Sequence, residues 1–296
     1  MNGIAAEMQY KKYSYVQDFY DDVYELLLKD EAQNLIILGN ILIGYMEVDK
    51  TGWRDPANWL MATASENGKI LLTALMTPPH NLTLYSTDNK MRPEALDCLI
   101  SGLAQENIPG VISEKNLALA FAEKYSASKQ LSYSMQMNQR IYELTDLEQN
   151  IKTDGTIRLV NTNDMHFLPY WLEAFKAADI YGRTDMNIPQ SSQEAQYLIN
   201  SNKTYVLEIN GIPVSMAGFS RPLVTAIGIA LVYTPPYFRR NGYATSLVTQ
   251  LSQTALYNGY KKCVLYTDLS NPTSNNIYQK IGYKPVCDSH MLKFSE

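Results

Sequence analysis

Cysteine and histidine are scarce in this chain of 296 residues, which contains three of each. The cysteines are far apart and odd in number, so a disulfide framework is not expected. Neither residue type shows the spacing of a metal site, which argues against a zinc centre. The residues concerned are Cys98, Cys263, Cys287, His80, His166 and His290. We therefore expect a protein without a bound metal.

Long apolar runs and an excess of positive charge are also missing. The most apolar segment, residues 34–44, is too short and too interrupted by Gly and Asn to span a bilayer. Lys11, Lys12 and Asp18 break any apolar run near the start, which argues against a signal peptide. The net charge of −5 argues against broad binding to nucleic acid or to an anionic membrane. We expect a cytoplasmic protein with neither of these partners.

The length favours two domains, since about 150 residues per domain is usual. Residues 145–155 form a polar segment that ends in the turn dipeptide Asp154-Gly155. An extended run precedes this segment, and residues 156–160 read as a new strand. The sequence therefore predicts one domain over residues 1–150 and a second over residues 151–296.

The second half alternates helical and extended patterns, with a strong hairpin turn at Asn210-Gly211. Its predicted helices carry residues 167–175, 194–199, 242–257 and 275–281. Its predicted strands cover residues 204–208, 214–219, 226–234 and 262–267, with one or two more within 284–294. The pattern is that of an α/β fold with a mixed sheet.

The first half has a partly similar order of predicted helices and strands. Helices are predicted over residues 15–28, 31–41 and 92–104, and strands over 59–64, 70–76 and 82–86. Two registers for an internal repeat compete: Asn67-Gly68 against Asn210-Gly211, or Thr77-Pro78-Pro79 against Thr234-Pro235-Pro236. Their offsets differ, so only one can hold. We prefer the hairpin register because it keeps the flanking strands in phase.

The segment Arg239-Arg240-Asn241-Gly242-Tyr243-Ala244 joins the end of a predicted strand to the start of a predicted helix. Unpaired N–H groups and the dipole at a helix N-terminus favour an anion there. Gly242 allows close approach of a phosphate, and the two arginines add positive charge. Taken alone, the segment is equally compatible with a surface turn carrying two solvated arginines.

Two motifs in order resemble the GNAT superfamily of acetyltransferases. Residues 239–244 match its pyrophosphate loop, Arg/Gln-x-x-Gly-x-Gly/Ala. Residues 271–283, Asn-Pro-Thr-Ser-Asn-Asn-Ile-Tyr-Gln-Lys-Ile-Gly-Tyr, match its second motif, Asn-x-x-Ser/Ala-x-x-Ile/Leu-Tyr-x-x-x-Gly-Tyr/Phe. The resemblance covers roughly Thr156 to Phe294. It implies an acetyl-CoA-dependent N-acetyltransferase whose domain is a mostly antiparallel, twisted sheet flanked by helices.

The resemblance also implies roles for individual residues. Tyr278 would protonate the leaving thiolate as general acid, although a core aromatic is the alternative. Asn271 would contact the cofactor arm, or else merely start a turn. The residues implied to bind acetyl-CoA are Val232, Tyr233, Thr234, Arg239, Arg240, Asn241, Gly242, Tyr243, Ala244, Thr245, Asn271 and Ser274.

The general base is not evident, because the predicted strand 226–234 carries no acidic residue. Glu173, Glu208, Asp268 or a water chain are the alternatives, and each carboxylate is also compatible with a surface or turn position. The acceptor is expected to be an amine of a small molecule or peptide. Alternatives are another acyl donor, as in mycothiol synthase or Fem-type peptidyl transferases, or a non-catalytic acyl-CoA sensor. A monomer or a homodimer is expected.

The first half lacks both motifs. Residues 87–94 stand where a phosphate loop would be expected, but no glycine matches and Pro93 removes a backbone donor. We interpret this half as a degenerate GNAT-like domain, with an unrelated accessory α/β domain as the alternative.

Overall fold

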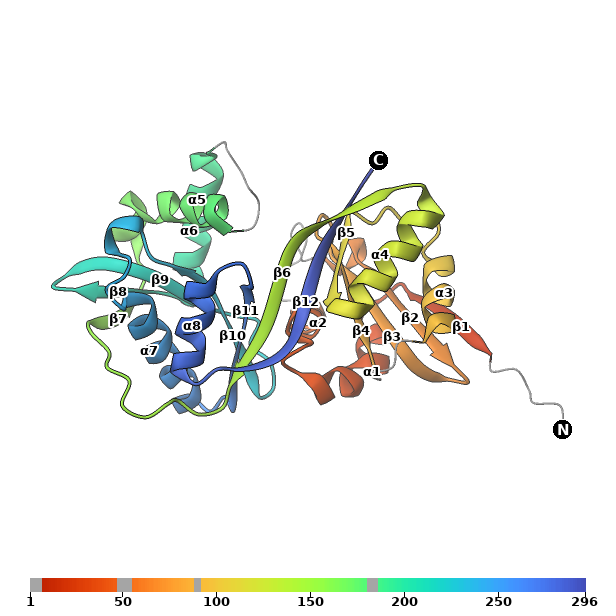
Figure 1. The fold of residues 1–296 in the computed structure, drawn as a ribbon, viewed down its shortest axis with the longest axis horizontal. Coiled ribbons are helices and arrows are strands. Elements are labelled where there is room, and N and C mark those ends of the chain that lie inside the picture. The colour runs from red at the N-terminus through yellow and green to blue at the C-terminus, as the bar shows by residue number, and fades with distance from the viewer. Residues whose placement is uncertain (1–6, 47–54, 88–91, 180–185) are drawn as a thin grey trace. The chain divides into compact units, whose positions relative to one another are not determined.

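The computed structural model describes residues 7–46, 55–87, 92–179 and 186–296 (Figure 1). The chain forms two compact units, of which the first contains Met1–Gln139 and Cys287–Glu296 and the second contains Arg140–Val286. The division thus lies at Gln139–Arg140, and not at the polar segment 145–155. That segment is a connection within the second unit, which explains why its composition resembles a linker.

The first unit is a sheet with helices on both faces. Its strands, in hydrogen-bonded order, are β1 (Met8–Tyr13), β2 (Leu60–Glu66), β3 (Lys69–Met76), β4 (Leu82–Ser86), β5 (Gly110–Glu114) and the end of β12 (Lys284–Ser295). Its helices are α1 (Val16–Leu27), α2 (Leu35–Tyr45), α3 (Pro93–Gly102) and α4 (Lys115–Lys129), with short 3₁₀ turns η1 (Leu28–Asp30) and η3 (Pro56–Asn58). Neighbouring strands are antiparallel except for the parallel pair β4–β5.

The second unit has the same construction. Its strands, in hydrogen-bonded order, are the end of β6 (Ser132–Leu144), β11 (Lys262–Asp268), β10 (Ala226–Tyr233), β9 (Ile212–Ser220), β8 (Thr204–Ile209) and β7 (Thr156–Leu159). Its helices are α5 (Leu168–Asp179), α6 (Ile188–Ser201), α7 (Tyr243–Tyr257) and α8 (Pro272–Ile281), with 3₁₀ turns η4 (Thr162–His166) and η5 (Pro236–Phe238). The strands from β7 to β10 are antiparallel and β10–β11 is parallel. The predicted mixed, mostly antiparallel α/β fold is confirmed.

The two units repeat one order of elements: strand, two helices, three strands, helix, strand, helix, strand. The hairpin β2–β3 turns at Asn67-Gly68 and the hairpin β8–β9 at Asn210-Gly211, all four with the positive φ of a type I′ turn. The hairpin register of the repeat is therefore confirmed. The two Thr-Pro-Pro segments follow β3 and β10, which are not equivalent strands, so their similarity is coincidental.

Helices cover both faces of the second sheet. Helices α7 and α8 cover one face through a core that includes Leu247, Val248, Leu251 and Ala255, the apolar stripe predicted for α7. Helices α5 and α6 cover the other face through a separate cluster that includes Leu168 and Leu172. None of the helices within the described residues is long and apolar enough to cross a membrane.

Candidate active site

Two neighbouring parallel strands separate in the middle of the second sheet. The ladder between β10 and β11 pairs Ala226–Gly228 with Lys262–Val264 and ends there, although β10 continues to Tyr233 and β11 to Asp268. Main-chain groups past the ladder are not used in pairing these two strands. A fork of this kind can accept an extended ligand as if it were an added strand.

A bulge reinforces the fork. Leu231 has a φ of 57°, and the pairing of β10 with β9 shifts register between Ala230 and Tyr233. A left-handed residue other than glycine costs about 1–2 kcal/mol, so the surrounding structure must hold it in place. Fully buried Ser215 of β9 donates its hydroxyl to the carbonyl oxygen of Tyr233, two residues after Leu231, at 3.0 Å. Sequence reasoning missed Ser215, because nothing marks it apart from other strand serines.

The segment between β10 and α7 is shaped by its own side chains. The Nε of Arg239 donates to the carbonyl oxygen of Thr234 at 2.9 Å, which folds this arginine back onto the strand end. The amide of Asn241 donates to the carbonyl oxygens of Phe238 and Arg239, at 3.2 Å each. Exposed Arg240, with a φ of 67°, makes no ion pair with any described residue. Both arginines keep their charge, but the guanidinium of Arg239 is tied to the strand end by its hydrogen bond to Thr234.

Helix α7 begins immediately after this segment. Gly242 is its N-cap with a φ of 78°, and a glycine offers no side chain to accept from the first-turn N–H groups. Tyr243, Ala244 and Thr245 form that first turn. Their N–H groups and the helix dipole favour an anion at this end. A side-chain atom built at Gly242 meets nothing within 4 Å, so the space beside the loop is open.

Helix α8 begins at a capped turn. The Asn271 side-chain oxygen accepts from the N–H of Ser274 at 3.1 Å, so Asn271 is the N-cap. The side-chain oxygen of Asn271 therefore starts a turn, as one of the two interpretations had it. The side-chain nitrogen is the group that remains for a ligand. Asn275 strengthens the same turn by donating to the carbonyl oxygens of Asp268 and Asn271, at 2.8 Å each.

Tyr278 lies one turn further along α8, with only 6% of its surface exposed. Its ring packs against Tyr142 and Tyr283, at centroid distances of 6.5 and 5.9 Å. The same hydrophobic cluster includes half-buried Val232 and Tyr243. The end of β10, the start of α7 and Tyr278 thus contribute to one hydrophobic cluster.

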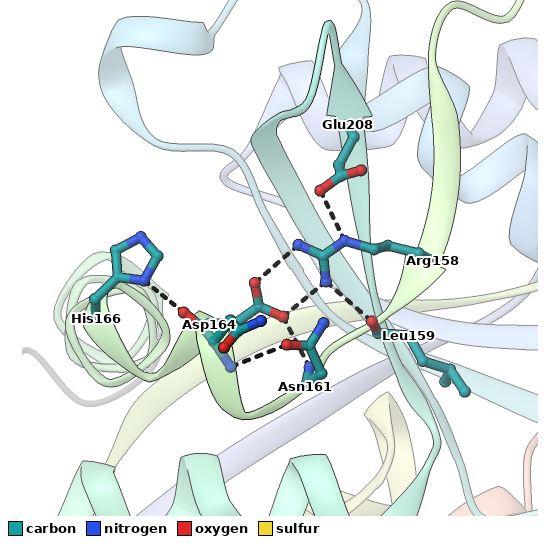
Figure 2. Close-up of polar contacts among 7 residues, drawn as sticks. Arg158, Leu159, Asn161, Asp164, His166 and Glu208 are labelled. Atoms are coloured by element: carbon teal, nitrogen blue, oxygen red, sulfur yellow. Dashed lines mark hydrogen bonds and ion pairs between the residues drawn. The ribbon is translucent and has the colours of Figure 1, made fainter.

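The three candidate bases each have other partners. Buried Glu173 accepts from the Ser191 hydroxyl and from the N–H of Asn187, which fixes the start of α6. Glu208 accepts from Nε of Arg158 at 2.7 Å (Figure 2). Asp268 accepts from the N–H and hydroxyl of Ser270, at 2.8 and 2.6 Å.

Tyr233 at the fork and the three cysteines of the chain stay protonated at neutral pH. Burial raises the pKa of Tyr233, although Arg239 beside it lowers that pKa in part. Burial also raises the pKa of all three thiols, to about 12 for Cys263 and Cys287 and by a smaller amount for Cys98. A thiol needs its thiolate form to act as a nucleophile, so none of the cysteines is suited to carry an acyl group. Within the described residues no cluster of three or more His, Cys, Asp or Glu side chains could hold a metal ion.

Comparison with known proteins bears on the same region. The family model for the acetyltransferase (GNAT) family matches residues 169–283. No curated protein matches the sequence of this chain.

Solved structures resemble the whole chain. A GCN5-related N-acetyltransferase from Sphaerobacter thermophilus is 14% identical with a TM-score of 0.60, over 96% of this chain and 95% of that one. A Drosophila protein is 11% identical with a TM-score of 0.67, over 97% and 98% of the two chains. A tandem GNAT protein from the clavulanic acid biosynthesis pathway is 9% identical with a TM-score of 0.56, over 98% of each. At such low identity the likeness concerns the fold, and it extends over both units.

Proposed function

We propose that this chain transfers an acetyl group from acetyl-CoA to a primary amine of a small molecule or peptide, since the model of the acetyltransferase (GNAT) family matches residues 169–283 of the second unit. The observation that carries the proposal is the fork between β10 and β11, which leads directly into the anion-binding start of α7. A cofactor with an extended arm and a diphosphate needs these two features side by side.

The proposed contacts follow from the groups that remain available. The pantetheine arm pairs with the main chain of Val232 and with the N–H of Thr234, whose carbonyl already accepts from Arg239. The diphosphate lies on the N–H groups of Tyr243, Ala244 and Thr245, with Arg240 supplying charge. Asn271 and Ser274, at the start of α8, contact the arm from the side of β11.

Direct attack is the proposed chemistry. The amine nitrogen bonds to the thioester carbonyl carbon, the carbon–sulfur bond then breaks, and coenzyme A leaves as a thiolate. That thiolate takes its proton from the Tyr278 hydroxyl, since a phenol of pKa near 10 can donate to a thiol of pKa near 8.5 when positioned beside it. Raised thiol pKa values at Cys98, Cys263 and Cys287 support direct transfer over an acyl-cysteine intermediate.

Deprotonation of the amine is the second requirement. An amine of pKa near 10.4 costs about 4.6 kcal/mol to deprotonate at pH 7, from roughly 3.4 pH units at about 1.36 kcal/mol each. Glu173, Glu208 and Asp268 are held by Ser191, Arg158 and Ser270, respectively. We therefore assign the proton to a water chain leading to solvent.

A non-catalytic acyl-CoA sensor is the second candidate, and the engagement of all three carboxylates is the observation that favours it. The transferase should release coenzyme A in the presence of an acceptor amine, and the sensor should not. Calorimetry first measures binding of acetyl-CoA, and a thiol-release assay then follows turnover over a panel of primary amines and peptides. Binding with release of coenzyme A on at least one acceptor supports the transferase. Binding without turnover on any acceptor favours the sensor, and absence of binding overturns both. Repeating the assay with propionyl-CoA tests whether another acyl group is the true donor.

A further inference from the structure

A hollow of about 220 Å³ lies in the second unit. The residues that line it come from the starts of β8 and β10 and from the ends of β9 and α7. Helix α7 has 15 residues and so is about 22 Å long, and the acetyl-CoA loop lies at its opposite end. A ligand in this hollow would therefore not overlap the proposed cofactor site.

Three of the residues that line the hollow are aromatic. They are Tyr205, Phe219 and Tyr260, and buried Ile227 and Ala255 also line it. The rings of Tyr205 and Phe219 meet edge to face, with centroids 5.7 Å apart. Such a surface suits a planar, apolar group, and the volume suits a molecule smaller than the drug-sized ligands of 300–1,000 Å³ pockets.

Main-chain hydrogen bonds fix the backbone that carries two of these aromatic residues. The N–H of Phe219 donates to the carbonyl oxygen of Lys203 at 2.8 Å. A side chain at neighbouring Gly218 would come within 3.1 Å of that oxygen, so glycine permits the close approach of β8 and β9. Tyr260 follows the left-handed Gly259, at a φ of 95°, and donates its N–H to the carbonyl oxygen of Ala255 at 3.2 Å. The backbone at Phe219 and Tyr260 is therefore set without a ligand.

The side-chain charge in the lining of the hollow is positive. Lys203 is the charged residue of the lining, is exposed, and makes no ion pair with any described residue. The chain segments that line the hollow, residues 202–206, 219–227 and 254–262, contain no Asp or Glu. The C-terminus of α7 adds about half a negative charge, which the full charge of Lys203 outweighs. The amide of Asn258 also lines the hollow and can donate to an anion.

We propose that this hollow is a binding site for a small aromatic carboxylate. The aromatic ring lies against Tyr205, Phe219 and Tyr260, and the carboxylate accepts from the Lys203 ammonium and the Asn258 amide. The proposal does not depend on acetyl transfer, because none of these residues belongs to the fork or the loop.

Calorimetry on the full chain with phenylacetate, and with phenylacetamide as the neutral compound of equal size, tests the site. We expect phenylacetate to bind at least tenfold more tightly than the amide. Lys203→Gln should lower phenylacetate affinity at least fivefold. Lys69→Gln makes the same charge change at an exposed position in the first unit and should alter affinity less than twofold. Tyr260→Leu, which removes a ring but keeps an apolar side chain, should also weaken binding at least fivefold.

Each of these measurements has one result that supports the proposal and one that overturns it. Equal affinity for acid and amide, or unchanged phenylacetate affinity in Lys203→Gln with an unchanged melting temperature, overturns the proposal. Displacement of phenylacetate by saturating acetyl-CoA also overturns it, because the ligand would then occupy the cofactor site. Binding that survives acetyl-CoA and depends on Lys203 supports the proposal, even if no amine is ever acetylated.

Discussion

The hydroxyl of Ser113 on β5 donates a hydrogen bond to the carbonyl oxygen of Leu84 on β4, at 2.8 Å. The ladder between these two parallel strands ends one residue earlier, at Thr83 and Ile112. The equivalent ladder of the second unit ends at Gly228 and Val264, and the next residue of its second strand, Leu265, has no hydroxyl. In the first unit the Ser113 hydroxyl thus occupies a carbonyl oxygen just past the end of the ladder. In the second unit the equivalent position is the one at which a ligand would pair with the strand. Of residues 87–94, where the phosphate loop was judged missing, residues 88–91 lie outside the described part of the chain.

This difference predicts one molecule of acetyl-CoA per chain. Calorimetric titration of the full chain should give a stoichiometry near one. Gly242→Asp should remove essentially all of the binding heat, because no second site remains in the first unit. A stoichiometry near two, or a residual site in that variant, would contradict the prediction.

Gly242→Asp should weaken acetyl-CoA binding by about 100-fold or more. A carboxylate about 4 Å from a phosphate repels it by roughly 4 kcal/mol at an effective dielectric constant of 20. A side chain at Gly242 meets no atom of the protein itself within 4 Å, so the free chain should fold. Gly211→Asp is a matched control, since Gly211 has the same φ of 78° and equally open surroundings in the β8–β9 turn. It should carry the same backbone strain and leave acetyl-CoA affinity unchanged.

Tyr278→Phe should lower kcat by about 10²-fold, the usual effect of losing a general acid, while acetyl-CoA affinity stays within about twofold. The ring that packs against Tyr142 and Tyr283 is retained, so stability should change little. Steady-state thiol release and calorimetry measure the two quantities. Tyr257→Phe, on the exposed side of α7, serves as control and should have full activity. Full activity in Tyr278→Phe would show that another group or water protonates the thiolate.

The pair Arg158–Asp164 should make stability depend on pH in the acid range (Figure 2). Burial raises the pKa of Asp164, but hydrogen bonds from Arg158 and from the N–H of Asn161 outweigh burial and lower it below 3.8. A lowered carboxyl pKa contributes stability that is fully present above about pH 4 and is lost as the pH falls through the folded value. The urea concentration at the midpoint of unfolding should therefore decrease as the pH is lowered from 4 to 2.

Asp164→Asn tests this assignment. The variant should be less stable by about 2 kcal/mol at pH 7, because it removes charged hydrogen bonds to Arg158. It should also lose less stability than the wild type on acidification, since the titrating group is gone. Asp146→Asn, at an exposed position, is the control and should match the wild type at every pH. Identical acid slopes in wild type and Asp164→Asn would refute the role of this carboxylate.

Local sequence patterns predicted many of the helices and strands. The stripe of Leu247, Val248, Leu251 and Ala255 predicted α7, and Asn210-Gly211 predicted the hairpin, because both depend on residues close together in the chain. Helix α4 (Lys115–Lys129) was missed, since its alanine- and serine-rich sequence gives little apolar periodicity. The boundary near residue 150 could not be predicted either. Strands β6 and β12 each begin in one unit and end in the other, and strand pairing over such distances leaves no local pattern.

By itself, the sequence determined that residues 239–244 lie between a strand and a helix and that Tyr278 lies on a helix over residues 275–281, although the structure begins that helix earlier, after the N-cap Asn271. These features follow from glycine, proline and capping residues, whose preferences are local. Only the tertiary structure decided that Leu231 is left-handed, that Ser215 donates to the carbonyl oxygen of Tyr233, and that the two parallel strands separate after Gly228. It also decided that Glu173, Glu208 and Asp268 have other partners. Each of these depends on groups brought together by sheet pairing and helix packing, and a linear pattern does not encode those distances.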